Sequence, residues 1–311
     1  MQISSKMALV IAALLSANAE ATMTRVQHAD SVTSLAFSPD GLTLLTGSKD
    51  HTAVSWNIST GTQVRVFNAF DIVQAVAYSP DGHDVLLAES RAGAYLLDGE
   101  TGENRHAYSV RRESVTSVAF SPDGKMVLTG APDIAMIWNI KVGAENGGMK
   151  IGGFSSMCGA SFSPDGQSVV TGASDRSAVL WNVKTGLREK TFEGHLGPVL
   201  SARISPDGTK LLTGSSDSTA ILWDIGSGTQ LRIFSAQRSA ISSVAWSYNG
   251  EQILTGSADG TVLLWDAVTG EHLNEFTSSD HSPVNTVAFS PDASLIAFGS
   301  QDGKAVIQTV K

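Results

Sequence analysis

The sequence predicts an all-β fold, a seven-bladed β-propeller whose blades are four-stranded antiparallel sheets. The tetrapeptide Ser-Pro-Asp-Gly occurs five times and two altered copies follow it, so seven related segments begin at Ser38, Ser79, Ser121, Ser163, Ser205, Ser247 and Ser290. They are spaced 41 to 43 residues apart, a repeat length that is typical of propeller blades. Thirty glycines and nine prolines agree with a chain of many short strands and tight turns.

Each repeat is predicted to form four strands joined by tight turns, and the first repeat shows the pattern. Runs of β-branched and apolar residues predict strands over residues 32–37, 44–47, 53–57 and 63–67. The turns between them fall at residues 38–41, 49–51 and 59–61. Ser-Pro-Asp-Gly suits a type I turn, because proline presets φ at the second position and glycine closes the turn. One repeat therefore predicts one blade.

The two ends of the chain are predicted to complete one blade together. The seventh repeat ends after its third strand, Lys304–Thr309, so its blade lacks an outer strand. Aligning the first repeat with the second places Thr22–Val26 where Gln63–Phe67 lies. The N-terminal residues can therefore supply the missing strand, which closes the ring and leaves no unpaired sheet edge.

Residues 1–19 differ from the rest and are predicted to form a cleaved signal peptide. Lys6 gives a positive start, Met7–Leu15 is an uninterrupted apolar run, and Ala17-Asn18-Ala19 offers a small-x-small cleavage site after Ala19. The alternative is a buried N-terminal helix, but the run is apolar on every face. The expected product is a single domain, residues 20–311, without a membrane span. It would be exported, to the periplasm of a Gram-negative bacterium or to the extracellular space.

Five of the third strands end in a recurrent residue pair, tryptophan followed by asparagine or aspartate. They read Trp56-Asn57, Trp138-Asn139, Trp181-Asn182, Trp223-Asp224 and Trp265-Asp266, and Gly194-His195 precedes the fifth repeat. With the period and the turn aspartates, this pattern resembles the WD-repeat family over residues 22–311. Six-bladed periplasmic propellers similar to the Tol-system protein share Ser-Pro-Asp-Gly, but the tryptophans favour the WD type. The resemblance implies a monomeric propeller that acts as a scaffold for a protein or peptide partner.

The resemblance also implies structural tetrads, in which a histidine, a strand-two threonine, a turn aspartate and the tryptophan are buried and hydrogen-bonded. Blade 1 matches with His28, Thr46, Asp50 and Trp56, and blade 5 matches with His195, Thr213, Asp217 and Trp223. Blades 3, 4 and 6 have Arg111, Gly153 and Gln237 in place of the histidine. Blade 7 keeps only Asp302, and blade 2 has Leu87, Arg91 and Leu97 in place of the threonine, aspartate and tryptophan.

A histidine, an aspartate and a threonine in register could activate a hydroxyl for catalysis. The same set recurs in several blades, however, whereas a reaction needs one site, and buried polar networks rigidify a fold. We therefore predict a structural role and no catalytic residue. The seven histidines lie singly and Cys158 is the only cysteine, so no metal site is predicted. No phosphate-binding loop, calcium loop or haem-attachment motif indicates a cofactor, and a net charge of −9 argues against nucleic acid as a partner.

Two function classes follow. The first is a non-catalytic interaction scaffold that binds a protein or peptide on its loop-bearing face. The candidate contact residues are Phe70 and Arg91 in blade 2 and Arg111 and Arg112 before blade 3, because aromatic and arginine side chains are common at interface hot spots. Alternatively, each arginine pairs with a neighbouring acid such as Asp71 or Glu113 and contributes little.

The second class is an exported propeller enzyme or small-ligand binder that uses the central funnel. Titratable residues clustered on the innermost strands would favour it. The first strands are rich in hydroxyls instead, with few acids or bases, and carry Thr33, Ser34, Thr116, Ser117, Ser201, Ser242, Ser243 and Thr286. This lining favours the scaffold.

Overall fold

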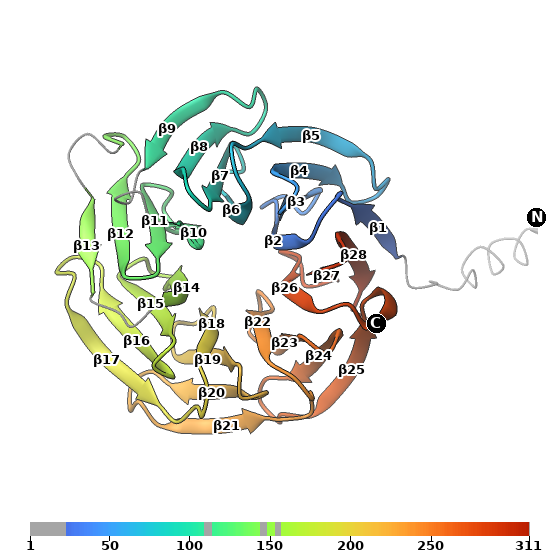
Figure 1. The fold of residues 1–311 in the computed structure, drawn as a ribbon. Helices are drawn as coiled ribbons and strands as arrows, with labels where there is room; N and C mark the ends of the chain where they lie inside the picture. Colours follow the sequence, from blue (N-terminus) through green and yellow to red (C-terminus); the bar gives the residue numbers. More distant parts are fainter. Residues whose placement is uncertain (1–22, 109–113, 144–147, 153–156, 311) are drawn as a thin grey trace, which may run out of the picture.

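Seven four-stranded antiparallel sheets are arranged as a ring around a central channel (Figure 1). The structure, a computed structural model, describes residues 23–108, 114–143, 148–152 and 157–310. In each blade the first strand lines the channel and the later strands follow outward in order, except that the outermost strand of blade 7 is β1. The predicted seven-bladed propeller is confirmed.

The first three blades follow one another along the chain. Blade 1 contains β2 (Val32–Phe37), β3 (Thr43–Ser48), β4 (Thr52–Asn57) and β5 (Gln63–Asn68). Blade 2 contains β6 (Val73–Tyr78), β7 (Asp84–Glu89), β8 (Gly93–Asp98) and β9 (Asn104–Tyr108). Blade 3 contains β10 (Ser117–Phe120), β11 (Met126–Ala131), β12 (Ile134–Asn139) and β13 (Met149–Ile151). The strands of the first repeat differ from their sequence-predicted bounds by at most one residue.

The remaining blades continue the pattern. Blade 4 contains β14 (Met157–Phe162), β15 (Ser168–Ala173), β16 (Ser177–Asn182) and β17 (Arg188–Glu193). Blade 5 contains β18 (Val199–Ile204), β19 (Lys210–Ser215), β20 (Ala220–Asp224) and β21 (Gln230–Phe234). Blade 6 contains β22 (Ile241–Trp246), β23 (Gln252–Ser257), β24 (Thr261–Asp266) and β25 (His272–Thr277). After the short 3-10 turn η1 (Ser279–His281), blade 7 contains β26 (Val284–Phe289), β27 (Leu295–Ser300) and β28 (Lys304–Thr309).

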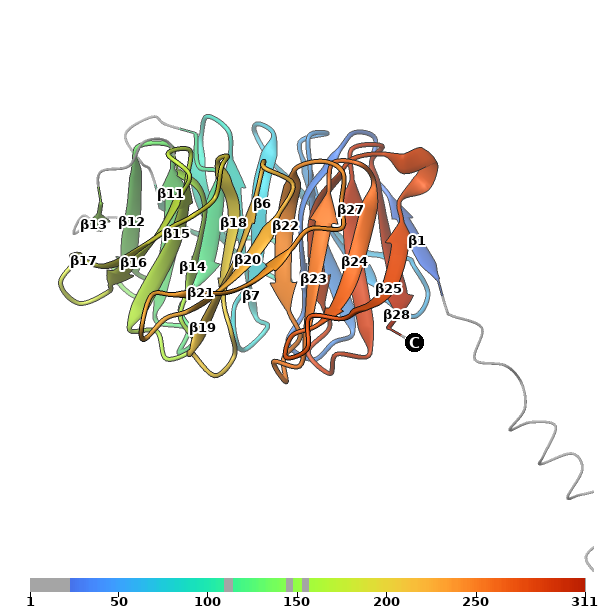
Figure 2. The same cartoon turned by 90° about the horizontal axis from the view of Figure 1, so that it is seen from below.

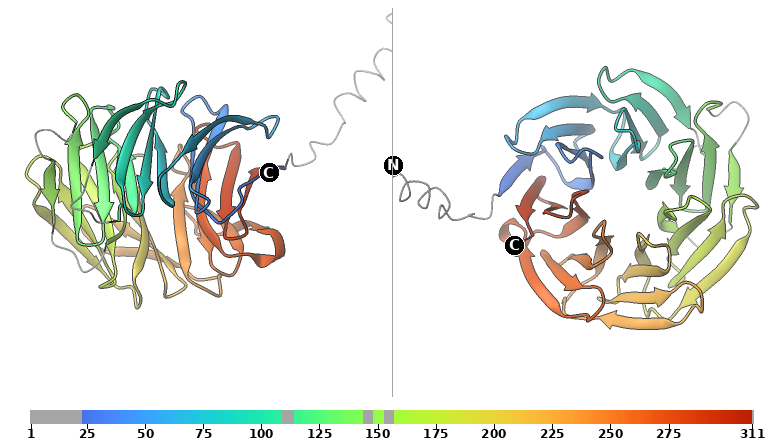
Figure 3. Two further views of the ribbon diagram at one scale, coloured as in Figure 1. Left: turned by 45° about the horizontal axis from the view of Figure 1, so that its top comes forward. Right: turned by 180° about the vertical axis from the view of Figure 1, so that it is seen from behind.

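The fourth strand of blade 7 is β1 (Thr24–Gln27), from the opposite end of the chain. It pairs antiparallel with β28, with Thr24 opposite Ile307 and Gln27 opposite Lys304. Figure 3 shows β1 and the C-terminal end of the chain beside each other at the rim. The predicted closure is confirmed, with Thr24–Gln27 as the described strand in place of the expected Thr22–Val26.

The core lies between neighbouring blades. In one cluster, Leu86 and Leu96 of blade 2 pack with Val118 and Trp138 of blade 3. The second strands of six blades carry a glycine where the next blade comes close, and blade 2 has Ala88 at this position. At Gly47 of blade 1, an added Cβ would lie 2.7 Å from a methyl of Val73, the first residue of blade 2. Burial of these side chains therefore holds neighbouring blades together around the channel.

The antiparallel order gives the disc two different faces, seen edge-on in Figure 2. One face carries the turns between second and third strands and the connections from one blade to the next, including η1, and we call it the loop-bearing face. The other carries the turns between first and second strands, and we call it the Ser-Pro-Asp-Gly face. In the first of these turns, the Gly41 backbone N–H donates to the Ser38 carbonyl at 2.9 Å and the Ser38 hydroxyl donates to Asp40 Oδ1 at 2.6 Å.

The seventh of these turns contains a strained residue and yields a testable prediction. Ala293 has φ of 57°, in the left-handed region, where the other six turns have glycine. This region costs a residue with a side chain about 1–2 kcal/mol. We expect Ala293→Gly to raise the free energy of unfolding by about 1 kcal/mol, after allowing for the greater freedom of glycine in the unfolded chain. Urea denaturation measures the change.

The opposite substitution in blade 5 is the control. Gly208 has φ of 73°, and no atom lies within 4 Å of an added Cβ, so Gly208→Ala changes the backbone preference without a clash. It should lower the free energy of unfolding by about 1 kcal/mol. If neither substitution moved the denaturation midpoint, the turn backbone would not be a source of strain.

Candidate functional site

The predicted tetrad residues of blade 5 lie within hydrogen-bonding distance of one another. The Trp223 indole Nε1–H donates to Thr213 Oγ1 at 2.8 Å. His195 Nε2 lies 2.8 Å from the same hydroxyl, and His195 Nδ1 lies 2.9 Å from Asp217 Oδ2. The carboxylate also accepts the backbone N–H of Leu196 at 2.8 Å, so it holds the connection from blade 4 onto the turn of blade 5.

Blade 1 has the same arrangement. Trp56 Nε1–H donates to Thr46 Oγ1 at 2.7 Å, and that hydroxyl lies 2.7 Å from His28 Nε2. His28 Nδ1 lies 2.9 Å from Asp50 Oδ2, which accepts the backbone N–H of Ala29 at 3.0 Å. Blades 1 and 5 therefore contain the same hydrogen-bond network of tryptophan, threonine, histidine and aspartate.

The order of donors and acceptors in this hydrogen-bond network follows from the groups present. An ionised aspartate only accepts, so the histidine Nδ1 carries the proton, and the unprotonated Nε2 accepts from the threonine hydroxyl. The threonine oxygen in turn accepts from the indole. Burial lowers the pKa of His28 and His195 below the ordinary value, although the neighbouring aspartate acts the other way, so both imidazoles are neutral at pH 7.

The geometry is that of a catalytic triad, but its location favours a structural role. Thr46 and Thr213 are 0% exposed, so no substrate reaches either hydroxyl. Each hydroxyl also accepts from an indole, a contact that a nucleophile would have to give up. A satisfied buried network of this kind stabilises one arrangement of the strands.

Other blades retain only part of this hydrogen-bond network. The tryptophan donates to the threonine hydroxyl at 2.8 Å in blade 3 (Trp138), 2.9 Å in blade 4 (Trp181) and 2.9 Å in blade 6 (Trp265). In blade 6 the Gln237 side-chain amide donates to the Thr255 carbonyl at 3.0 Å and not to its hydroxyl. The hydrogen-bond network of that blade therefore ends at the threonine hydroxyl. Arg111 and Gly153, the residues at the histidine position of blades 3 and 4, lie outside the described residues. Asp302 of blade 7 pairs with Lys304 at 3.1 Å.

Blade 2 uses a carboxylate that the sequence analysis missed. Glu89, 2% exposed, accepts the backbone N–H groups of Phe70 and Asp71 at 3.2 Å each through Oε2. It holds the connection from blade 1 as Asp50 and Asp217 hold theirs, although it lies at the end of β7 and not in the turn. Burial raises its pKa above the ordinary value. An acid at the last position of the second strand, where the other six blades have serine or alanine, was the available signal.

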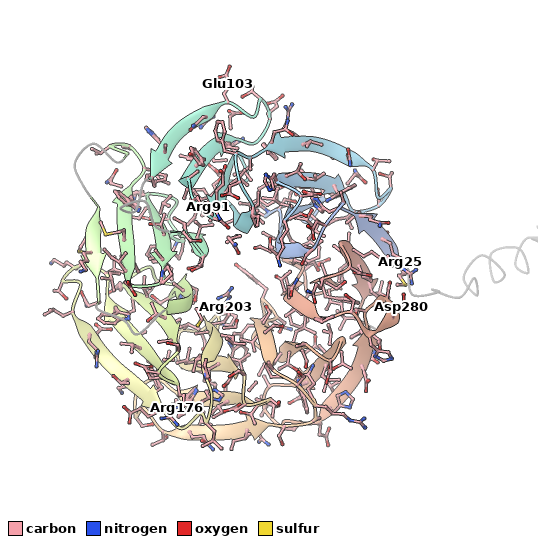
Figure 4. The ribbon with its side chains drawn as sticks, in the orientation of Figure 1. Arg25, Arg91, Glu103, Arg176, Arg203 and Asp280 are labelled. Atoms are coloured by element: carbon pink, nitrogen blue, oxygen red, sulfur yellow. The ribbon has the colours of Figure 1, made fainter. Side chains whose placement is uncertain are left out.

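Two of the four candidate partner-binding residues can be placed. Phe70 is 85% exposed on the loop-bearing face, and its ring centroid lies 6.3 Å from that of Tyr95. Arg91 extends from the turn of blade 2 with 90% of its side chain exposed, and its Nε lies 3.9 Å from Asp71 Oδ2 (Figure 4). Such a long, exposed ion pair contributes little energy. Arg111 and Arg112 lie outside the described residues.

The channel contains a second residue that was missed. The innermost strands were expected to carry hydroxyls with few charges, but Arg203 of β18 lines two cavities of the channel (Figure 4). In the part of the chain that the structure describes, no three histidine, cysteine or acidic side chains gather to hold a metal ion. No helix there has the length and apolarity needed to cross a membrane.

Comparison with known proteins gives a family match in six segments. The model of the WD domain, G-beta repeat, matches residues 20–57, 102–139, 150–182, 186–224, 228–266 and 270–307. The unmatched stretch contains the first three strands of blade 2, the blade that lacks the threonine, turn aspartate and tryptophan.

Individual relatives match over shorter stretches. The subunit I of eukaryotic translation initiation factor 3 from Aspergillus fumigatus is 36% identical over 85 residues, which is 27% of this chain and 25% of that protein. The corresponding protein of Emericella nidulans gives the same figures. A ribosome biogenesis protein BOP1 homolog of Aedes aegypti is 34% identical over 70 residues, 22% of this chain and 8% of that protein. The chain thus spans about a quarter or less of the length of these relatives.

These relatives correct one expectation. Export to a periplasm or to the extracellular space is contradicted, because their names place them in translation initiation and ribosome biogenesis, which are processes inside the cell. The lysine, the apolar run of nine residues and the small-x-small site are short local patterns, and they do not outweigh these similarities. The predicted cleavage after Ala19 lies outside the described residues.

Proposed function

The chain belongs to the WD40 family of WD-domain, G-beta repeats, and from this premise we propose that it is a non-catalytic scaffold that binds a protein or peptide partner on its loop-bearing face. Propellers of this family generally act as scaffolds. The relatives named above are a subunit of a multi-subunit factor and a biogenesis protein, which agrees with a role in assemblies.

The exposed pair Phe70 and Arg91 carries the proposal. Phe70 has 85% of its surface in water, and the ring contact that the structure gives it is a tilted one with Tyr95, at 6.3 Å between centroids. Aromatic and arginine side chains are enriched among the residues that dominate binding energy at interfaces. Both lie in blade 2, where leucines at positions 87 and 97 replace the tetrad threonine and tryptophan.

The support under Phe70 favours binding over an accidental exposure. The buried carboxylate of Glu89 accepts the backbone N–H groups of Phe70 and Asp71, so it fixes the backbone on both sides of the Phe70 Cα. A contact residue on a fixed backbone loses less conformational entropy when a partner binds. The weak pair between Arg91 and Asp71 leaves most of the guanidinium hydrogens free for the carboxylates of a partner.

Substitution of the pair tests the proposal. We expect the double variant Phe70→Ser with Arg91→Glu to bind its partner about 30-fold more weakly or worse, the effect of losing one hot spot worth about 2 kcal/mol. The measurement is quantitative mass spectrometry of proteins cross-linked to the folded chain in cells. A triple variant in which Arg91, Arg111 and Arg112 become glutamate should abolish the same capture.

A matched control lies on the opposite face. Tyr248, in the altered turn of blade 6, is 76% exposed, so Tyr248→Ser removes another largely exposed aromatic side chain, from the Ser-Pro-Asp-Gly face. We expect unchanged capture by this variant and unchanged melting temperatures for all three. Retained capture by the blade 2 variants, or loss with Tyr248→Ser alone, would place the partner elsewhere on the disc.

The alternative of an enzyme that works in the funnel has less support. Of the described residues that line the deeper channel cavity, only Arg203 and Cys158 have ionisable side chains. Burial raises the pKa of the Cys158 thiol, which disfavours the reactive thiolate. An arginine and a protonated thiol provide no general base at pH 7.

A further inference from the structure

One register position of the innermost strands differs in a single blade. The residue before the last of each innermost strand is small in six blades, namely Ala36, Ala77, Ala119, Ser161, Ala245 and Ala288. In blade 5 it is Arg203. Six small side chains leave space at this level of the channel, and the one long cationic side chain extends into that space (Figure 4).

Arg203 lies where two parts of the channel meet. It lines a cavity of about 190 Å³ in the interior and another of about 320 Å³ toward the Ser-Pro-Asp-Gly face. The side chain is exposed to water within the channel, yet the seven blades surround it. This enclosure lowers the pKa of the guanidinium from its ordinary value, although an arginine stays charged at pH 7.

The charge has no counter-ion among the described residues. The Arg203 side chain donates one hydrogen bond to a described residue, from Nη1 to the Ala202 carbonyl at 2.9 Å, and takes part in no ion pair with a described carboxylate. No described residue that lines either cavity is acidic. A cation in a channel without acidic lining residues attracts anions, and a guanidinium has five N–H donors to offer.

Hydroxyl groups provide further donors in the interior cavity. Ser34, Ser201 and Ser243 each accept a backbone N–H from the next blade, at 3.1, 3.2 and 3.2 Å, and each therefore keeps its own proton to donate. The Ser117 hydroxyl is buried with no partner in the described part of the chain. All four serines line the same cavity as Arg203.

We propose that the channel is a binding site for a small free oxyanion of the phosphate or sulfate class, held by Arg203 and the surrounding serine hydroxyls. Charge-assisted hydrogen bonds to such an anion would supply the missing counter-charge. The interior cavity of about 190 Å³ holds an anion of this size with some water and is too small for a folded segment of a partner. The site does not depend on the partner-binding surface, because Arg203 lies next to the opposite face of the disc.

Calorimetric titration of the full chain with inorganic phosphate tests the site, with sulfate and acetate as separate arms. We expect saturable binding of phosphate and sulfate, and weaker binding of acetate, which offers two oxygen acceptors instead of four. Arg203→Ala should weaken phosphate binding about tenfold or more, as expected for the loss of a charge-assisted hydrogen bond. Arg238→Ala removes an exposed arginine from the connection between β21 and β22, which lines neither cavity, and this variant should bind as the unchanged chain does.

Thermal melting gives a second reading. At matched ionic strength, phosphate should raise the melting temperature of the unchanged chain more than sodium chloride does, and this difference should vanish in Arg203→Ala. Without phosphate, Arg203→Ala should melt at the same or a higher temperature, because it carries the alanine of five other blades and loses an enclosed charge. If that variant does not fold, Arg203→Gln keeps the length without the charge. Equal phosphate binding with and without Arg203, or no saturable binding at all, would overturn the proposal.

Discussion

A chain that lacks residues 1–27 is expected to lose about 4 kcal/mol or more of its free energy of unfolding and to aggregate. The deletion removes β1, which pairs with β28 from Thr24 to Gln27. It also removes Val26, 3% exposed, from a cluster with Val54 and Trp56 of blade 1. Burial of a valine is worth about 2 kcal/mol, and each net backbone hydrogen bond contributes about 0.5–1.5 kcal/mol. Typical domains have only about 5–15 kcal/mol in total.

Guanidinium denaturation and size-exclusion chromatography measure this effect. The unpaired edge of β28 is a template for pairing with another chain, so association should accompany the loss of stability. A deletion of residues 1–19 alone keeps β1 and should leave the denaturation midpoint unchanged. Val26→Asp, which buries a charge in the same cluster, should act in the same direction as the longer deletion. A stable monomer after removal of β1 would mean that the ring does not depend on its closing strand.

Trp223→Phe is expected to lower the free energy of unfolding by about 1–3 kcal/mol. The substitution removes the indole donor from Thr213 and leaves a cavity beside Phe192, whose ring centroid lies 5.9 Å from that of Trp223. The threonine hydroxyl, which is 0% exposed, cannot replace the lost partner with bulk water. Thermal and urea denaturation together measure the change.

Two controls separate the network from packing. Trp265→Phe removes the corresponding indole from blade 6, where Gln237 does not extend the hydrogen-bond network beyond the Thr255 hydroxyl. This variant should lose less free energy of unfolding than Trp223→Phe, because the longer network of blade 5 is expected to be cooperative. Leu97→Phe in blade 2 touches no such network, and any loss there comes from packing. An unchanged melting temperature for Trp223→Phe would contradict the assignment of a tetrad in blade 5.

The repeat made the fold predictable, because turn chemistry and strand patterning agree in seven copies. Ser38, Asp40 and Gly41 specify a turn through contacts within a few residues, and the strands on both sides follow. Ring closure was also predictable, since a missing strand at one end matched an extra strand at the other. The blades follow from local rules repeated at a constant spacing, whereas the closure follows from a comparison of the strands present at the two ends of the chain.

The residues that were missed act across the repeat and not within it. Glu89, at the end of β7, binds the connection from blade 1 as a turn aspartate does in other blades. This role depends on where that connection lies in the folded ring, which the sequence does not show. Arg203 occupies an ordinary strand position, and its significance comes from six other blades that supply small residues at the same level. A sequence pattern predicts which side chains of one strand face the channel. The surroundings of such a side chain depend on all seven innermost strands together.

The pairing of β1 with β28 also sets the order of events during synthesis. Blades 1 to 6 each consist of consecutive residues and can form their sheets as the chain emerges, whereas blade 7 needs Thr24–Gln27 and Lys304–Thr309 together. At about 5–20 residues per second, the first strand waits roughly 15–60 seconds for its partner. Contacts between such distant residues are slow to form, because the intervening chain must be brought together first. The nascent protein is therefore an open arc with two unpaired ends for nearly the whole of its synthesis, and this interval is when it most needs protection by a chaperone.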